Sequence, residues 1–473
     1  MDSRDLPELR VGALAELLRR GEISSVDIVG ACLSRIDRLN STLAAFITVD
    51  ADGALRAARH ADRARGRGHA RGPLHGLPFA VKDAFWAKGL PATNGSRLFA
   101  DFVPSEDATV VARLRAAGAI LLGKLNMMEL GFGPTLHPPF GTPRNPWNLE
   151  RTPGGSSSGS ASAVAARLVP VTLGGDTGGS IRLPAALCGV VGLKPTRGRV
   201  SRHGLMKICP AFDSAGLLAA SVVDVARVLQ VIAGHDRRDP GTSRVAVGDY
   251  VAATTGGVAG ARLGVVKELM ESPVLDPEVR RLVSDGVATL ETAGARVTEV
   301  SLPLMAHASA IYVGVAEPEA AVLYRAALMA RASEIDVLPR RRLLAASLLP
   351  ASMVARARQL GERLRVQVDE ALRDVDVLLG PTTPSGAPPI PATSRLQSKE
   401  EAWTTAVAGR SVFTNPFNVT GHPALSVPCG FTREELPAGL QIIGRYYGEA
   451  DVLRIGAVYE SLTEWHHRRP PLA

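Results

Sequence analysis

The 473-residue chain has little of several features that mark particular protein classes. Aromatic residues make up 4% of it, and its four cysteines form no C-x-x-C pair, so neither a disulfide framework nor a zinc site is indicated. No uninterrupted apolar run reaches the ~18 residues of a membrane span, and no basic segment followed by an apolar one opens the chain. We therefore expect a soluble, cytoplasmic protein with no metal and no membrane partner.

Negative charge is also in short supply, because 54 lysines and arginines face 46 acidic residues, for a net charge of +8. The excess is spread along the chain, apart from Arg340 to Arg342 and His466 to Arg469, so we expect no nucleic-acid partner. Arg340 to Arg342 either lie on a solvated helix face or bind a carboxylate. The 46% hydrophobic and 21% charged residues are typical of a globular protein, and most of the chain should fold.

Short apolar runs alternate with helical patterns from about residue 77, which is typical of an α/β fold around a buried sheet. The expected strands are 79–81, 120–122, 169–173, 263–266, 377–379, 425–427 and 440–443. Two amphipathic helices precede them over about 8–40, the second capped by Ser24 with Asp27 three residues later. We predict one domain, residues 1–473, with a helical insertion over about 305–375.

Two glycine- and serine-rich segments, 152–160 and 174–182, flank one predicted helix and strand. Each segment alone could be a flexible linker, but the ordered apolar pattern that follows favours turns inside a domain. Gly154 and Gly159 have the spacing of a phosphate-binding loop. However, Ser160 and Ala161 stand where such a loop needs Lys and Ser or Thr, which argues against nucleotide hydrolysis.

The second segment suits acyl transfer, in which a hydroxyl attacks a carbonyl and backbone N–H groups bind the oxyanion. Gly178 and Gly179 allow successive N–H groups to turn into one concavity, with Ser180 at its edge. None of the ten histidines has a spacing that marks it as the base. Lys82, at the end of an apolar strand, is the candidate base if burial lowers its pKa; the alternative is a lysine that reaches water or pairs with Asp83.

These motifs together resemble the amidase signature family. Residues 154–160 are similar to its Gly/Ser-rich segment, residues 174–182 to its nucleophile loop, and Lys82 to its lysine, at separations that fit the family. The similarity covers most of the chain, through 123–127, 142–147, 192–196, 418–424 and 439–444.

The resemblance implies a mixed central β-sheet covered by helices on both faces, and a Ser–cis-Ser–Lys triad. Ser180 would be the nucleophile that forms an acyl-enzyme, and Ser156, on a cis peptide bond, would bridge it to a neutral Lys82. The oxyanion hole would be formed by the N–H groups of Thr177, Gly178, Gly179 and Ser180. Asp176 and Arg182 would give structural support, and Ser157 and Ser158 would either aid catalysis or cap the next helix.

The family acts on varied amides, so the motifs leave the substrate open. We expect a stand-alone amidase for a small-molecule linear amide, because residues 128–140 depart from the acidic, Ser-rich version of the A subunit of glutamyl-tRNA amidotransferase. That protein, which releases ammonia from glutamine for a partner, is the alternative, and a non-catalytic binding scaffold is a remote one. No cofactor is expected, and a homodimer is an option for assembly. Substrate contacts are expected in 127–140, in 305–350 and near Trp403, with the candidates Met127, Leu130, Gly131 and Phe132.

Overall fold

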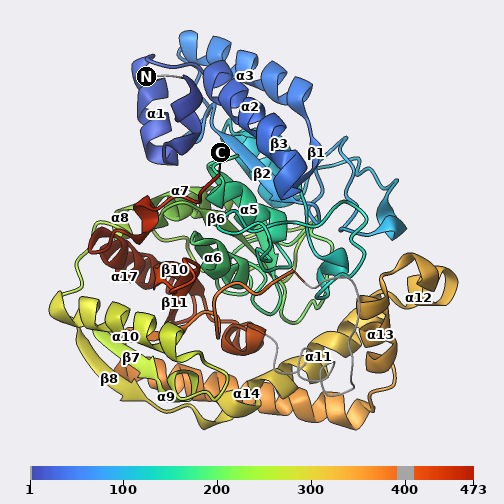
Figure 1. Ribbon diagram of the computed structural model, residues 1–473, viewed down its shortest axis with the longest axis vertical. Helices are drawn as coiled ribbons and strands as arrows, with labels where there is room; N and C mark the ends of the chain where they lie inside the picture. The colour runs from blue at the N-terminus through green and yellow to red at the C-terminus, as the bar shows by residue number, and fades with distance from the viewer. Residues whose placement is uncertain (1–2, 391–409, 473) are drawn as a thin grey trace.

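The protein is described by a computed structural model, which covers residues 3–390 and 410–472. One mixed sheet of 11 strands runs through it in the order β1-β3-β2-β4-β6-β5-β10-β11-β9-β7-β8 (Figure 1). The strands are β1 (Phe46–Val49), β2 (Pro78–Lys82), β3 (Ile120–Leu125), β4 (Val171–Asp176), β5 (Val191–Lys194), β6 (Ser214–Ala219), β7 (Arg262–Val266), β8 (Arg296–Val300), β9 (Val377–Pro381), β10 (Ala424–Phe431) and β11 (Pro437–Gly444). All seven expected strands are confirmed, and β1, β5, β6 and β8 are additional.

Strand β2 lies between β3 and β4 and is parallel to both, whereas β4, β6, β5, β10, β11 and β9 pair antiparallel in turn. Every residue of β2, β3, β4, β5 and β6 is buried. Strands covered on both faces read as nearly continuous apolar runs, which is why the sequence pattern identified β2, β3 and β4. The mixed sheet that the resemblance implied is confirmed.

Sixteen α-helices lie in the described part of the chain. They are α1 (Val11–Arg20), α2 (Ser25–Leu43), α3 (Ala51–Gly66), α4 (Thr109–Ala116), α5 (Ser158–Ala165), α6 (Arg182–Cys188), α7 (Val222–Ile232), α8 (Tyr250–Ala253), α9 (Lys267–Met270), α10 (Pro277–Thr292), α11 (Ala308–Leu323), α12 (Arg325–Arg331), α13 (Val337–Ala346), α14 (Ala351–Asp374), α16 (Pro416–Thr420) and α17 (Glu449–Ser461). None of them is long and apolar enough to cross a membrane.

Helices cover both faces of the sheet, as alternation along β10 demonstrates. A Cβ added at Gly439 would lie between Ser426 of β10 and Ala186 of α6. On the other face, a Cβ added at Gly456 of α17 would meet Leu425, the neighbouring residue of β10. Since successive residues of a strand point to opposite faces, α6 and α17 lie on opposite sides of the sheet.

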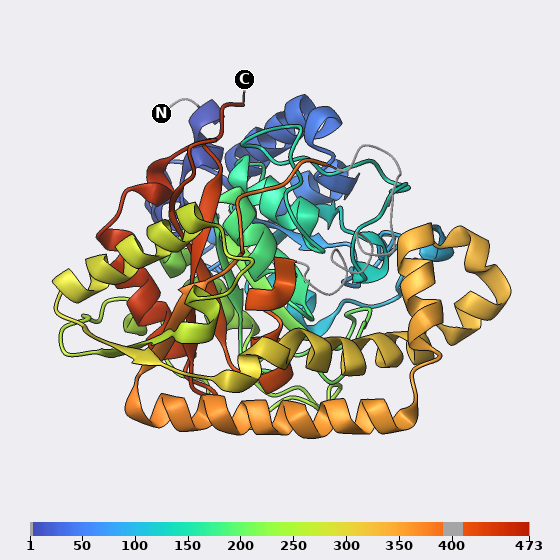
Figure 2. The same ribbon diagram turned by 60° about the horizontal axis from the view of Figure 1, so that its bottom comes forward.

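The expected N-terminal pair of helices corresponds to α1 and α2. The capping box at Ser24 is confirmed: its hydroxyl accepts the N–H of Asp27, and the Asp27 carboxylate accepts the N–H of Ser24. The segment expected to be helical over about 305–375 contains α11 to α14. Figure 2 shows α11 alongside the long α14, with α12 and α13 at one end of them. Trp403 lies outside the described residues.

Candidate active site

Lys82 ends β2 in the interior of the sheet, where 2% of its surface is exposed. Burial disfavours the ammonium form and lowers the pKa of Lys82 from 10.5 to about 7, although Asp176 and Asp213 act in the opposite direction. Asp83 does not pair with it, because the Asp83 carboxylate lies 3.0 Å from the ammonium of Lys124 on β3. Lys82 is therefore a buried lysine whose pKa lies close to physiological pH.

The first glycine- and serine-rich segment forms a turn beside Lys82. The peptide bond between Gly155 and Ser156 is cis, and Ser156 Oγ is hydrogen-bonded to Lys82 Nζ over 2.7 Å. The N–H of the next residue, Ser157, donates to the carbonyl of Ser180 over 3.2 Å. These contacts bring the three predicted catalytic residues, Lys82, Ser156 and Ser180, into one region.

Ser157 occupies the N-cap position of α5, but its side chain makes no capping hydrogen bond. Its hydroxyl donates instead to the carbonyl of Gly175, 3.3 Å away at the end of β4. The capping role considered for Ser157 is therefore wrong, because its hydroxyl accepts no N–H of α5 and is turned toward the strand. Ser158 is the first residue of α5 and is buried.

The predicted nucleophile loop connects β4 to α6 and folds around the carboxylate of Asp176. Asp176 accepts the N–H of Gly179 over 2.7 Å and that of Ile181 over 3.1 Å. Gly179 has a φ of +127°, and a Cβ there would collide with Thr414 Oγ1, so only glycine fits. The structure thus differs from the expected oxyanion hole, because the Gly179 N–H is turned toward Asp176. The N–H groups of Thr177, Gly178 and Ser180 remain as candidates.

A buried ion pair stabilises the loop. Asp176 and Arg182 are both fully buried, with Oδ1 and Nη2 3.0 Å apart. Arg182 also donates to Asn418 Oδ1 over 2.6 Å and to Gln441 Oε1 over 2.7 Å, and Asn418 Nδ2 donates to Asp176 Oδ1 over 2.8 Å. Burial alone would raise the pKa of Asp176, but Arg182 and these hydrogen bonds hold it well below its usual value.

Asn418 and Gln441 were not predicted as site residues. Both lie in segments that resemble family motifs, which was the available signal. Their role depends on contacts with Arg182 across more than 200 residues of chain, and no local spacing reveals such contacts.

The four predicted pocket residues divide into two pairs. Met127 lines a small cavity beside Lys82, and a Cβ added at Gly131 would lie 3.4 Å from Ser156 Oγ. Leu130 and Phe132 are instead buried in an apolar cluster with residues such as Ile208. The first pair lies beside the predicted triad, and the second belongs to the core.

The arginine run on α13 has protein partners at two of its three positions. Arg342 forms an ion pair with Glu317 of α11 and donates to the carbonyl of Phe132 over 2.6 Å. Arg340 donates to the carbonyl of Ala332 over 3.1 Å, and Arg341 is exposed. Arg342 thus connects α13 to α11 and to residue 132.

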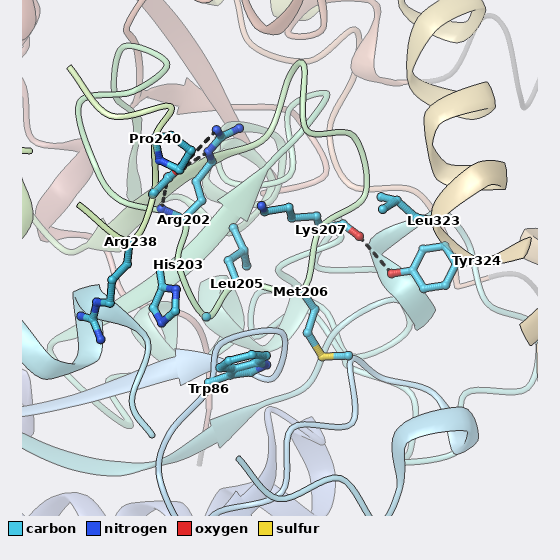
Figure 3. A pocket seen from close by; sticks show the side chains of 12 residues that line it. Trp86, Arg202, His203, Leu205, Met206, Lys207, Arg238, Pro240, Leu323 and Tyr324 are labelled. Atoms are coloured by element: carbon cyan, nitrogen blue, oxygen red, sulfur yellow. Dashed lines mark hydrogen bonds and ion pairs between the residues drawn. The ribbon is translucent and has the colours of Figure 1, made fainter. Parts of the chain in front are cut away.

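A larger cleft, of about 420 Å³, is shown in Figure 3. Leu205 and Met206 line both the cavity beside Lys82 and this cleft. Its polar residues include Arg202, which is paired with Asp239, and the exposed Lys207. Neither of the predicted catalytic serines lines this cleft. Over residues 3–390 and 410–472, no three His, Cys, Asp or Glu side chains are grouped so as to hold a metal ion.

Comparisons with known proteins agree with the motifs. Residues 27–453 match the family model described as Amidase. The A subunit of the glutamyl-tRNA(Gln) amidotransferase of Chloroflexus aggregans is 40% identical over 493 residues, covering 99% of both chains. Among solved structures, the peptide amidase of Stenotrophomonas maltophilia is 34% identical over 98% of both chains, with a TM-score of 0.85.

The A subunit of the glutamyl-tRNA(Gln) amidotransferase of Thermotoga maritima is 31% identical to this chain, with a TM-score of 0.82. The match covers 97% of this chain and 95% of that one. Relatives of both kinds therefore share the whole fold with it. From its two serine–glycine motifs, its mixed sheet and these matches, the chain belongs to the amidase signature family of C–N bond hydrolases.

Proposed function

We propose that this protein hydrolyses a carboxylic amide through a triad of Ser180, Ser156 and Lys82. The observation that carries the proposal is the 2.7 Å hydrogen bond between Ser156 Oγ and Lys82 Nζ, in a site where burial lowers the pKa of the lysine to about 7. A base whose pKa lies near the working pH is well suited to proton transfer. A relay through Ser156 gives that base a route to Ser180.

In this mechanism Ser180 Oγ attacks the amide carbonyl while its proton passes through Ser156 to neutral Lys82. The N–H groups of Thr177, Gly178 and Ser180 stabilise the oxyanion. Collapse of the tetrahedral intermediate breaks the C–N bond, and Lys82 returns its proton through Ser156 to the leaving amine. Water then attacks the acyl-enzyme by the same route, which releases the acid and regenerates Ser180.

The network around Asp176 supports the loop in this role. Its carboxylate accepts the N–H of Gly179, and the side chains of Arg182 and Asn418 donate to the same carboxylate. The Thr177 hydroxyl donates to Asp213 over 2.6 Å at the start of the loop, whereas Arg182 lies at its end. A loop fixed at both ends keeps its remaining N–H groups in place before the substrate binds, which is the basis of electrostatic preorganisation.

The comparisons favour the A subunit of a glutamyl-tRNA amidotransferase over a stand-alone amidase. The amidotransferase relative from Chloroflexus aggregans is 40% identical over the full chain, against 34% for the peptide amidase. In that role the amide would be glutamine, a partner protein would receive the ammonia, and the expected absence of a nucleic-acid partner would be wrong. The observation that favours a stand-alone amidase is the departure of residues 128–140 from the acidic, Ser-rich version of the amidotransferase.

The experiment is a hydrolysis screen of the purified chain against glutamine, primary amides, anilides and peptide amides, with Ser180→Ala as the blank. Hydrolysis of a small amide by the chain alone would support a stand-alone amidase. Glutaminase activity that appears only with a co-purifying partner would support the amidotransferase role. Hydrolysis of any of these amides by Ser180→Ala at the wild-type rate would refute the triad.

A further inference from the structure

The small cavity beside Lys82 has room for a water molecule. About 10 Å³ is open to the centre of a water-sized sphere, and a polar cavity needs room for about one such sphere to hold a buried water. Its polar lining comes from Lys82, Asn94, Asp176, Thr177, Asp213 and Ser214. A site of this size and polarity suits one small hydrogen-bonding molecule.

Most of these polar groups already have partners. Asn94 donates to the hydroxyl of Tyr324, Thr177 donates to Asp213, and Asp176 is held by Arg182. Asp213 accepts the Thr177 hydroxyl and the N–H of Ile208, so four of the six polar lining residues already have partners.

Two groups around the cavity still need a partner. Ser214 is 4% exposed, and in the described part of the chain its Oγ has no hydrogen-bond partner. Within the same residues, Lys82 Nζ makes its hydrogen bond only to Ser156, although a neutral amine has two N–H groups and a lone pair. Buried polar groups are nearly always hydrogen-bonded, so one molecule in the cavity would serve both Lys82 and Ser214.

Building on the proposed function, we propose that one water bound between Lys82 Nζ and Ser214 Oγ orients the catalytic base. The water accepts an N–H from Lys82 and is held by the Ser214 hydroxyl. This bond fixes the rotation of the amine, so that the lone pair of neutral Lys82 faces Ser156. Ser214 is then a positioning residue, the third group that orients the base of a nucleophile–base pair.

The water also solvates the ammonium that forms when Lys82 takes a proton. Lys82 is faced by the carboxylates of Asp176, at the end of β4, and Asp213, before β6, and both favour the ammonium. Toward β3, Asp83 and Lys124 neutralise each other. Loss of the water therefore removes solvation from the charged form and leaves the facing charges unchanged. The predicted effect is a lower pKa for Lys82.

The test has a structural arm and a kinetic arm. A crystal structure of the wild type at ~1.5 Å should show a water within hydrogen-bonding distance of both Lys82 Nζ and Ser214 Oγ. Ser214→Ala should lower kcat/KM by about tenfold, the lower end of the loss seen when a group that orients a metal ligand is removed. It should also move the rising limb to lower pH, because the ammonium form of Lys82 loses solvation. The matched control is Ser426→Ala, a buried strand serine in contact with Thr382, which should leave both quantities unchanged.

Two results would overturn the inference. One is a cavity with no ordered water in contact with Lys82. The other is a Ser214→Ala enzyme with the wild-type kcat/KM and pH profile. Failure of the proposed function is a separate outcome, because it would appear as hydrolysis that survives Ser180→Ala. A wild-type pH profile in Ser214→Ala, together with loss of hydrolysis in Ser180→Ala, would refute the role of the water and support the triad.

Discussion

Replacing Lys82 by methionine should destroy activity and stabilise the fold at neutral pH. A fall in pKa from 10.5 to about 7 corresponds to about 5 kcal/mol of unfavourable free energy for burying the ammonium. Methionine has a similar length and no charge. It loses the hydrogen bond to Ser156, which costs about 1–3 kcal/mol because that hydroxyl stays buried. The net expectation at pH 7 is a gain of about 2–4 kcal/mol in the free energy of unfolding.

The pH dependence of this gain follows from proton linkage. Between pH 7 and 10.5 the unfolded chain binds more protons at Lys82 than the folded one, so the stability of the wild type rises with pH in that range. The advantage of Lys82→Met is fully present below pH 7 and is lost as the pH rises toward 10.5. Urea unfolding of both proteins, followed by tryptophan fluorescence at several pH values, measures the difference.

Lys124 supplies the matched control for this experiment. It is also a fully buried lysine on a neighbouring strand, but its ammonium is paired with Asp83 at 3.0 Å. Lys124→Met would leave a buried carboxylate unpaired and should destabilise the protein by about 3–5 kcal/mol. If Lys82→Met is less stable than the wild type at pH 7, with a difference that does not change up to pH 10, burial does not lower the pKa of Lys82.

Three further predictions concern the reaction. The kcat/KM of the wild type should rise with pH through one ionisation near 7. Lys82→Ala should lose as much activity as Ser180→Ala, whereas Ser156→Ala should keep measurable activity, because a water can partly bridge the gap between Ser180 and Lys82. Near-normal turnover of Lys82→Ala with an unchanged pH profile would contradict the relay. Chelation should leave the rate unchanged, and a rate lost with chelator and restored by zinc would point to metal-assisted hydrolysis. Asp176→Asn should lower kcat far more than it raises KM, because it loosens the loop that carries Ser180; an equal change in both would indicate a role in binding.

The parts of the fold that the sequence predicted share a physical cause. Strands β2, β4 and β11 are buried along their whole length, so most of their residues are apolar and the runs are easy to recognise. The capping box at Ser24 was equally clear, because all of its partners lie within four residues. The exposed edge strand β8, with its charged and polar residues, gave no such signal.

The parts that the sequence could not predict depend on where long-range acceptors lie. Ser157 stands at a helix N-terminus, yet its hydroxyl turns to a carbonyl of the crossing strand. The N–H of Gly179 was expected to face the oxyanion, but Asp176 accepts it. Asn418 and Gln441 meet Arg182 only because β10 and β11 enter the sheet beside β5. The local sequence determines which polar groups are present, and the tertiary fold determines which of them already have hydrogen-bond partners.

Covalent labelling is the most direct test of Ser180 as the nucleophile. The full chain is treated with a sulfonyl fluoride, and the modified residue is located by mass spectrometry of its peptides while the loss of amide hydrolysis is followed. We expect one modification, on Ser180, that grows in proportion to the loss of activity and is absent in Ser180→Ala. Inactivation that follows modification of another serine, with Ser180 unmodified, would contradict it.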